Sequence, residues 1–348
     1  MKKAYIILGC DTDPDRASFI SGVTDEKLSW TGLEQGILRT KEASSTILDS
    51  NSKKPVFSWC LRVDDQIRHY YGDYSWVLKT YTSLFEELVE SGDELSWHPH
   101  FWRLNTEKNM WFQEINDKNW QVNMLQKSFG AYQNVFPDSP LSVRMGWNFH
   151  NNLSMQTLKE LGIKVDFSGV PGMKVEPSPS KIENSYDWFF APNQPYAPAM
   201  DDFQADVGLT QNQGIIEVPN LVSESLMWGY IAGLVLAKKM KDLQPLFSAI
   251  RKPRYWINIS ARKKYFKPVL DQFCHVLKKS KQDTIIFNNY FHADDMVDNN
   301  SGLYSLQDFC INLQDLINSA YTSNIEVHFI QARQAWNLLT VPRNSQQN

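Results

Sequence analysis

The sequence predicts an α/β protein folded as a distorted (β/α) barrel of seven or eight parallel strands. Short apolar runs alternate with helical patterns along most of the chain, which is typical of parallel strands joined by crossover helices. About eight such units favour a barrel, and a doubly wound open sheet is the competing layout. No internal repeat or Gly/Ser linker divides the 348 residues. We therefore expect one domain over 1–340 and a frayed tail over 341–348.

The expected elements follow from the spacing of apolar residues and from cap residues. Apolar runs predict strands over 4–10, 55–62, 94–97, 141–144, 164–167, 214–218, 255–259, 284–290 and 325–330. Helical spacing predicts helices over 74–90, 119–134, 154–161, 265–279, 306–320 and 332–339. Gly92 and Gly162 are placed to end two of these helices, and Asn151 or Asn152 to cap another. The Pro-rich stretch 170–213 fits no regular element, and loops of that length in compact domains are usually functional.

The composition suits a globular protein with a large core. The formal net charge is −4 and there is no basic tract, so nucleic acid is not an expected partner. The longest apolar run, 226–237, is shorter than the roughly 20 residues of a membrane-spanning helix, so no transmembrane segment is expected. Cys10 follows an apolar stretch too short for a signal peptide. With cysteines scattered without paired spacing, this favours a cytoplasmic protein; the oligomeric state stays open.

Polar residues recur where the expected strands end. In barrels and open α/β sheets, ligands bind outside the carboxyl ends of the parallel strands. A repeated delivery of polar groups to that edge therefore indicates a site. The residues concerned are Asp11, Asp13, Arg62, His98, His100, Arg144, Asp166 and His292.

The strongest local signal is His98-Pro99-His100, directly after the strand expected over 94–97. Residues i and i+2 of an extended chain point to the same side, so both imidazoles can reach one metal ion. Asp11-Thr12-Asp13 repeats this spacing with carboxylates. Two imidazoles and one carboxylate are the ligand mix of an open hydrolytic metal site, and the other carboxylate is then free to act as a base. Taken singly, an acidic turn and two ordinary loop histidines are the alternatives.

Together these motifs resemble those of the polysaccharide deacetylase superfamily, the NodB-homology carbohydrate esterases. Asp11-Thr12-Asp13 is similar to the early Asp motif, and His98-Pro99-His100 to the paired-His motif. Val143-Arg144-Met145-Gly146-Trp147, Val165-Asp166-Phe167-Ser168 and Tyr290-Phe291-His292 resemble the later Arg, Asp and His motifs. The spacing departs from the usual pattern, since Thr12 separates the two Asp residues and the histidines stand two apart rather than four. His98-Pro99-His100-Phe101-Trp102-Arg103 is closer to a divergent, WbmS-like branch of surface-polysaccharide and O-antigen biosynthesis.

The resemblance implies a metal-dependent hydrolase that removes an acetyl or similar acyl group from a sugar or glycan intermediate. Asp13, His98 and His100 would bind a divalent ion, Zn²⁺ first and Co²⁺, Ni²⁺ or Mn²⁺ as alternatives. Asp11 would be the base and His292, on the opposite side of the ion, the acid. Arg144 would orient Asp11, and Asp166 would hold His292 in its cationic form. The residues expected to contact the sugar are Arg62, Trp97, Trp102 and Trp147.

Two other interpretations fit the same residues. The altered motif spacings also fit a non-catalytic sugar-binding protein on this fold. Such a protein would lack a metal or a base. Another metal-dependent amide hydrolase would use the same ligands, and a phosphoesterase would need more positive charge and often a second metal.

Overall fold

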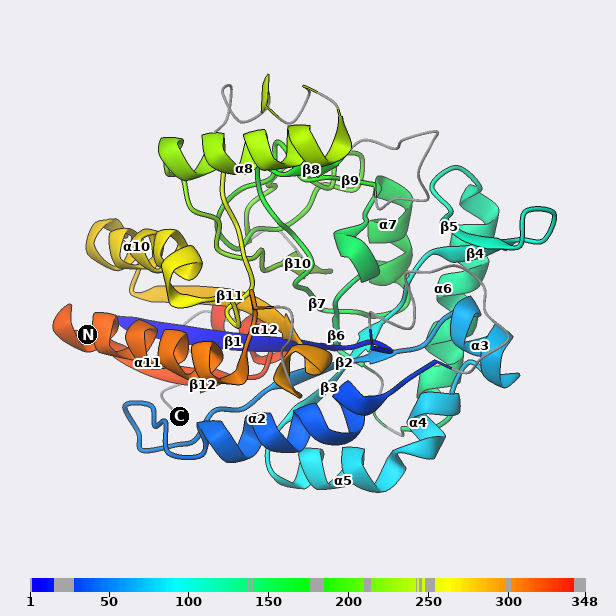
Figure 1. Cartoon of the computed structure of the whole chain (residues 1–348), viewed down its shortest axis with the longest axis horizontal. Helices are drawn as coiled ribbons and strands as arrows, with labels where there is room; N and C mark the ends of the chain where they lie inside the picture. Colours follow the sequence, from blue (N-terminus) through cyan, green and yellow to red (C-terminus); the bar gives the residue numbers. More distant parts are fainter. Residues whose placement is uncertain are drawn as a thin grey trace.

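The computed structural model describes residues 2–15, 28–136, 138, 140–175, 185–209, 214–241, 243, 246–247, 254–297 and 302–340. Its centre is one curved sheet in the order β10-β7-β6-β3-β2-β1-β11, with β12 also paired to β1 (Figure 1). Every strand pair in this sheet is parallel. The strands are β1 (Lys3–Thr12), β2 (Ser58–Arg62), β3 (Glu94–His98), β6 (Ser142–Val143), β7 (Val165–Asp166), β10 (Ile216–Glu217), β11 (Thr284–His292) and β12 (Glu326–Ile330). The predicted α/β barrel-like fold is confirmed, with eight parallel strands.

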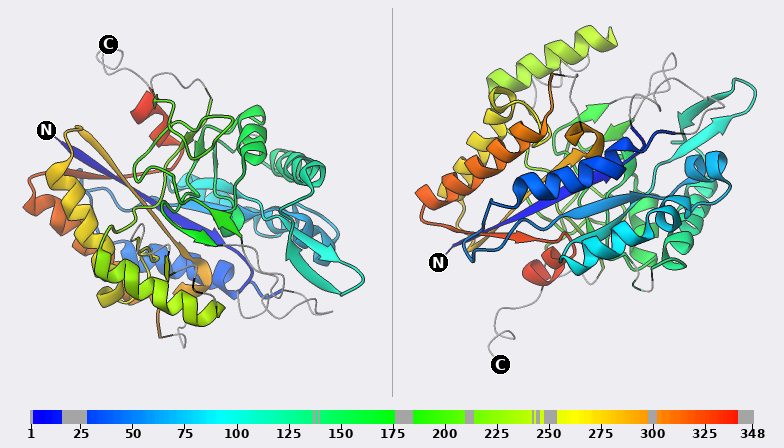
Figure 2. Two further views of the ribbon diagram at one scale, coloured as in Figure 1. Left: turned by 90° about the horizontal axis from the view of Figure 1, so that it is seen from above. Right: turned by 60° about the horizontal axis from the view of Figure 1, so that its bottom comes forward.

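Helices cover the outside of the curved sheet (Figures 1 and 2). They are α2 (Ile37–Ser44), α3 (Asp65–Tyr71), α4 (Trp76–Thr80), α5 (Thr82–Glu90), α6 (Lys118–Gln133), α7 (Asn152–Glu160), α8 (Leu226–Met240), α10 (Lys263–Lys279), α11 (Leu306–Thr322) and α12 (Gln334–Thr340). Short helical turns stand at η1 (Gly32–Gly36), η2 (Gly146–Asn148) and η4 (Ala293–Met296). None of the helices in the described ranges combines the length and hydrophobicity needed to cross a bilayer.

Strand β1 organises the sheet because it is buried along most of its length. The apolar run that precedes Asp11 is almost entirely inaccessible. One edge of β1 pairs with β11 along the whole strand, from Lys3 to Asp11. The other edge pairs first with β12 and then, from Gly9 onward, with β2. The sheet therefore divides around β1, and the carboxyl end of β1 lies between β2 and β11.

Polar contacts from β11 bring the two sides of the curved sheet together. The Asn288 side-chain amide of β11 donates to the carbonyl of Val218, just after β10, at 2.7 Å. The backbone N–H of Leu221 donates to the Asn288 carbonyl at 3.0 Å. Asn288 is buried, where each unmade hydrogen bond would be costly. These bonds take the place of strand pairing between β10 and β11.

Some sequence-based expectations are wrong. Residues 255–259 do not form a strand, since only Tyr255 makes an isolated bridge, to Ser223. The helix expected over 74–90 is two helices, because Tyr81 leaves the helical conformation (φ −112°, ψ 25°) and α5 starts after it.

Two kinds of regular element were not predicted at all. The first kind is helical and comprises α2, α3 and α8. The second kind is the small hairpin, seen in β4–β5 (Trp102–Asn105, Met110–Gln113) and in β8–β9 (Lys174–Val175, Tyr186–Asp187). The frayed tail expected over 341–348 lies outside the described residues, as do parts of the predicted loop 170–213.

Candidate metal centre

The polar residues singled out in the sequence come from the carboxyl ends of neighbouring parallel strands. Asp11 of β1 lies opposite His292 of β11 in the ladder, and Arg62 of β2 lies opposite His98 of β3. Arg144 directly follows β6, the next strand beyond β3. Parallel pairing therefore gathers five strand ends at one edge of the sheet, as the sequence predicts.

Asp13, His98 and His100 form a compact set of metal-ligand atoms. The Nε2 atoms of the two histidines are 3.0 Å apart. Asp13 Oδ1 lies 3.3 Å from His100 Nε2, and Asp13 Oδ2 lies 3.6 Å from His98 Nε2. Donor atoms bound at about 2.0–2.1 Å around a tetrahedral ion are separated by roughly 3.3 Å. The three side chains thus fit one divalent ion without rearrangement.

The two histidines are held with Nε2 turned toward this point. His98 Nδ1 lies 2.6 Å from the Arg144 carbonyl oxygen, to which it donates its proton. Such a bond fixes the tautomer that leaves Nε2 free for a metal. The ring of His100 packs against Gly146, where a Cβ would lie 2.1 Å from the ring. The turn that follows holds Trp147 and Asn148 at positive φ (55° and 54°), a conformation that costs free energy in residues with side chains.

The buried side chain of Arg62 forms an ion pair with Asp13. Its Nη1 lies 2.7 Å from Asp13 Oδ1, and the guanidinium is itself held by Asp64 and by Gln66 Oε1 at 2.8 Å. Burial disfavours the ionised Asp13, but the charges of His100, His98 and Arg62 outweigh it and hold the pKa of Asp13 well below its usual value. Arg62 is fully buried, so its predicted role as a sugar contact is wrong.

Asp11 is fixed by Arg144. Arg144 Nε lies 2.9 Å from Asp11 Oδ1 and 3.2 Å from Oδ2. The other guanidinium nitrogens donate to the Phe167 carbonyl and to Asn148 Oδ1, and the guanidinium carbon lies 3.3 Å from the centre of the Tyr290 ring. Burial disfavours the ionised Asp11, but the charge of Arg144 outweighs it and lowers the pKa of Asp11. Asp11 is thus an oriented, ionised carboxylate, as the sequence-based role of Arg144 requires.

His292 and Asp11 lie at the ends of neighbouring strands. The two residues are partners in the β1–β11 ladder, and His292 Nδ1 lies 3.9 Å from Asp13 Oδ2. Ligand atoms of Asp11, Asp13 and His292 all lie within 4.8 Å of one another, which makes them a second candidate metal group sharing Asp13. His292 Nδ1 is buried and makes no hydrogen bond to any described residue. The placement of Asp11 and His292 on opposite sides of the ion stays a prediction.

Asp166 is not the partner of His292. Its Oδ2 lies 2.7 Å from His150 Nε2, and its Oδ1 accepts from the Ser168 backbone N–H at 3.1 Å. Burial and the adjacent Asp166 raise the pKa of Glu217 well above its usual value. The carboxylates that face His292 are Asp11 and Asp13. The physical reason is the position of His150, which loop residues after η2 bring against β7.

The predicted tryptophan contacts divide between the core and the site. Trp97 is fully buried and its indole donates to Ser128 Oγ of α6 at 2.8 Å, so its predicted sugar contact is wrong. Trp102 and half-buried Trp147 pack with Trp111 in a small cluster, and the Trp147 ring lies 6.5 Å from that of His100. The sequence analysis missed Trp111, whose hairpin is indicated by the alternation over 102–113 around an Asn-rich turn.

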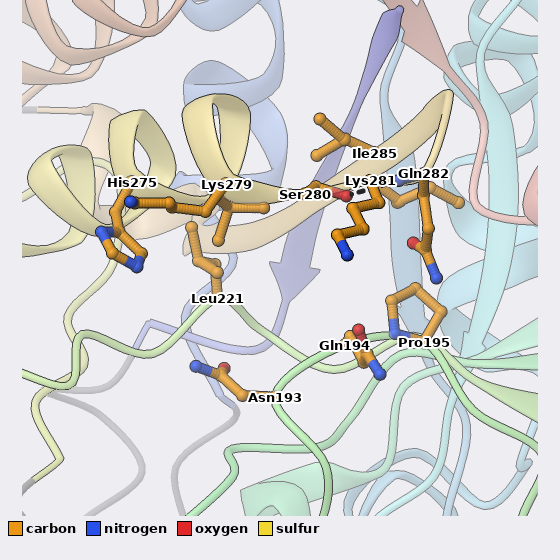
Figure 3. A pocket seen from close by; sticks show the side chains of 12 residues that line it. Asn193, Gln194, Pro195, Leu221, His275, Lys279, Ser280, Lys281, Gln282 and Ile285 are labelled. Carbon is orange, nitrogen blue, oxygen red and sulfur yellow. Dashed lines mark hydrogen bonds between the residues drawn. The ribbon is translucent and has the colours of Figure 1, made fainter.

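A separate cavity of about 400 Å³ lies far along β11 from this centre (Figure 3). Its lining includes Lys279 near the end of α10, Gln194 of a long loop, and Ile285 and Ile286 at the start of β11. His292 stands at the other end of that strand. The cavity and the metal-ligand residues thus occupy opposite ends of the sheet.

The comparisons with known proteins bear on the fold. No family model matches the chain, and no curated protein matches its sequence. Among solved structures, PuuE allantoinase superposes with a TM-score of 0.52 and 9% identity over 97% of this chain and 91% of that one. A Parabacteroides distasonis protein described as a glycoside hydrolase/deacetylase gives a TM-score of 0.55 and 12% identity over 99% and 73% of the two chains. This chain therefore has the fold of the polysaccharide deacetylase-like hydrolases that the sequence motifs resemble.

Replacing either imidazole of the ligand set should release the metal. His98→Ala or His100→Ala leaves two protein ligands, too few for tight binding of one zinc ion. We expect near-stoichiometric metal in the wild-type protein and a loss of about tenfold or more in affinity in each variant, measured by elemental analysis and competition with a chelator. His275→Ala, at an exposed histidine of α10, is the matched control and should keep its metal. Full occupancy in both site variants would refute the ligand assignment.

The buried acid pair predicts an unusual pH dependence of stability. The pKa of Glu217 is raised in the folded protein. Its contribution to the free energy of unfolding is therefore fully present at a pH below its pKa in the unfolded chain, and it is lost as the pH rises through its pKa in the folded protein. Glu217→Gln keeps an oxygen that accepts from the Gly169 N–H. Because glutamine does not ionise, the variant does not lose stability in this way as the pH rises. We expect the variant to melt at a higher temperature than wild type at pH 7.5 and at nearly the same temperature at pH 4.5.

Asp166→Asn is the contrasting variant, because it removes the buried carboxylate charge that is paired with His150. It should destabilise the protein by about 3–5 kcal/mol at neutral pH. Calorimetry across the pH range checks both variants, and a Glu217→Gln protein less stable than wild type at pH 7.5 would contradict the raised pKa of Glu217.

Proposed function

We propose that this protein is a metal-dependent deacetylase that removes an acetyl group, or a similar acyl group, from a sugar in surface-polysaccharide biosynthesis. The observation that carries the proposal is the convergence of Asp13, His98 and His100 on one point, with Asp11 and His292 beside it. The shared fold supports a hydrolase of this class. Membership of the superfamily and of its WbmS-like branch is part of the proposal.

The ligand set favours Zn²⁺ over Mg²⁺ or Ca²⁺. Two imidazole nitrogens and one carboxylate suit a borderline ion, whereas the hard cations prefer oxygen alone. Co²⁺, Ni²⁺ and Mn²⁺ are accepted by the same donors. A divalent ion held by Asp13, His98 and His100 would polarise the acyl carbonyl and lower the pKa of a water molecule at an open position.

Asp11 acts as the general base in this proposal. It takes a proton from the water whose oxygen attacks the acyl carbon. Arg144 keeps the Asp11 carboxylate ionised and fixes its direction through two contacts. Because Arg144 also lowers the pKa of Asp11, this base is weak, and it relies on the acidity that the bound ion gives to the water.

His292 supplies the second proton. It protonates the sugar nitrogen as the C–N bond breaks, so that a free amine and an acetate are the products. The carboxylates of Asp11 and Asp13 lie close to His292, whose Nδ1 is 3.9 Å from Asp13 Oδ2. Its place next to Asp11 in the ladder allows the proton gained by Asp11 to return to His292 between turnovers.

The sugar is expected to bind beside Trp147, whose ring lies next to His100. Trp102 and Trp111 pack against that ring. A cytoplasmic location stays a prediction, and the four free cysteines of the described chain are compatible with a reducing compartment.

Acetate release from a panel of N-acetyl sugars tests the proposed activity. We expect the metal-loaded wild-type protein to release acetate and Asp11→Asn to keep its metal while losing about 10²–10⁴-fold in kcat, the range for a lost general base. If Asp13→Asn keeps both metal and fold and loses only turnover, the roles of Asp11 and Asp13 are exchanged. A metal-loaded protein without activity on any acyl sugar would favour the non-catalytic sugar-binding interpretation.

The leaving group distinguishes the role of His292. An acid is needed most when the departing group is a poor one, so His292→Ala should slow release from an N-acetyl sugar far more than hydrolysis of an activated acetate ester. The ratio of the two rates is the measurement. Equal losses on both substrates would instead indicate that His292 binds metal as a member of the second candidate group.

A further inference from the structure

Helix α8 exposes a broad apolar face. It lies at the periphery of the molecule, along the top of the view in Figure 1 and outside the other helices in Figure 2. Six large side chains on it are between 40% and 67% exposed, namely Leu226, Met227, Tyr230, Ile231, Leu234 and Val235. They follow one another at alternating spacings of one and three residues, which places them on one side of the helix. Leu243 and Phe247 extend the apolar surface beyond the helix.

The packing of α8 is inverted relative to an ordinary surface helix. A surface helix normally turns its large apolar residues to the core and its polar residues to water. In α8 the buried positions include Gly229 and Gly233, and half-buried Trp228 and Ala232 complete the inner face. Small residues thus occupy much of the inner side, and the large apolar residues remain outside. Exposed apolar surface of this extent in a soluble domain marks an interaction site.

The charges around α8 are one-sided. No charged residue stands between Glu224 and Lys238, and Glu224 is neutralised by Arg254 at 2.7 Å. Lys238 and Lys241 are exposed at the carboxyl end of the helix. Three lysines, at 238, 239 and 241, outnumber the single acidic residue at this end, Asp242. An apolar face with an excess of lysines at one end is complementary to a bilayer that carries anionic headgroups.

We propose that α8 docks this protein on the surface of an anionic lipid bilayer. The helix is too short to span a bilayer, so it would lie in the interface with its apolar face among the acyl chains. A protein partner would be met by a polar rim around an apolar centre. The exposed face of α8 offers no such rim from Leu226 to Ala237.

The segment that precedes α8 starts at the edge of the sheet where the candidate metal ligands lie. The chain leaves β10 at that edge and enters α8 after Ser223, which bridges to Tyr255. Trp256 stacks on Tyr290 with ring centres 5.0 Å apart, and Tyr290 lies against Arg144. Docking through α8 would therefore hold the metal centre close to the bilayer. If the proposed deacetylase activity is correct, its sugar is one carried on a lipid.

Flotation of the full-length protein with vesicles tests the surface directly. We expect it to float with vesicles of phosphatidylcholine mixed with phosphatidylglycerol, weakly with phosphatidylcholine alone, and less as salt is raised. Ile231→Glu with Val235→Glu should reduce the bound fraction by about tenfold or more, since two charges would enter the interface. Lys238→Glu with Lys241→Glu should weaken binding to the anionic vesicles alone.

The matched control is Leu38→Glu, which places a charge at a similarly exposed leucine of α2 and should leave flotation unchanged. Circular dichroism confirms that each variant is folded. Release of acetate from a water-soluble sugar should be equal in wild type and the Ile231/Val235 variant, so a loss of deacetylation in both refutes the function and not the docking. No flotation of wild type, flotation that the double variant leaves unchanged, or self-association that the double variant abolishes would each overturn the proposal.

Discussion

The candidate centre depends on two buried pairs of opposite charge. Asp13 is paired with Arg62 and Asp11 with Arg144, and all four side chains are nearly inaccessible to solvent. An isolated carboxylate in such a position would cost several kcal/mol and would take up a proton. The arginines keep both acids ionised, and only ionised carboxylates can bind a metal or accept a proton. The fold brings the pairs together because both acids lie at the end of β1, Arg62 at the end of β2 and Arg144 directly after β6.

Much of this site follows from the sequence because its rules are local or depend on strand direction. The i, i+2 spacing of His98 and His100 fixes their common side, and parallel strands bring the ends of β1, β3 and β11 to one edge. The same alternation explains the error at Trp97. It precedes His98 in an extended strand and therefore points to the opposite face, toward α6. The sequence contained this information, and the residue type alone suggested a sugar contact.

The remaining differences rest on contacts between distant segments. Asp166 has two candidate histidines, and nothing in its own neighbourhood selects one. His150 reaches it because the turn after Arg144 takes positive φ at two consecutive non-glycine residues, a conformation that sequence rules disfavour. In the same way, Arg62 shows no local sign that it is buried behind Asp13. Helix α8 was noted in the sequence for its hydrophobicity, but which side of it would face outward depends on packing.

The balance of charge also favours one metal ion over two. Asp13 belongs to both candidate groups, but Asp11 is already engaged by Arg144 and Asp13 by Arg62, which also pairs with Asp64. One divalent ion leaves the site with a net positive charge suited to a water molecule losing its proton and to a developing oxyanion. A second divalent ion would need further carboxylates to offset repulsion between the ions and the arginines. In the proposed reaction His292 is therefore better placed to carry a proton than to bind a second metal, and its position beside Asp11 in the ladder puts the proposed base next to the proposed acid.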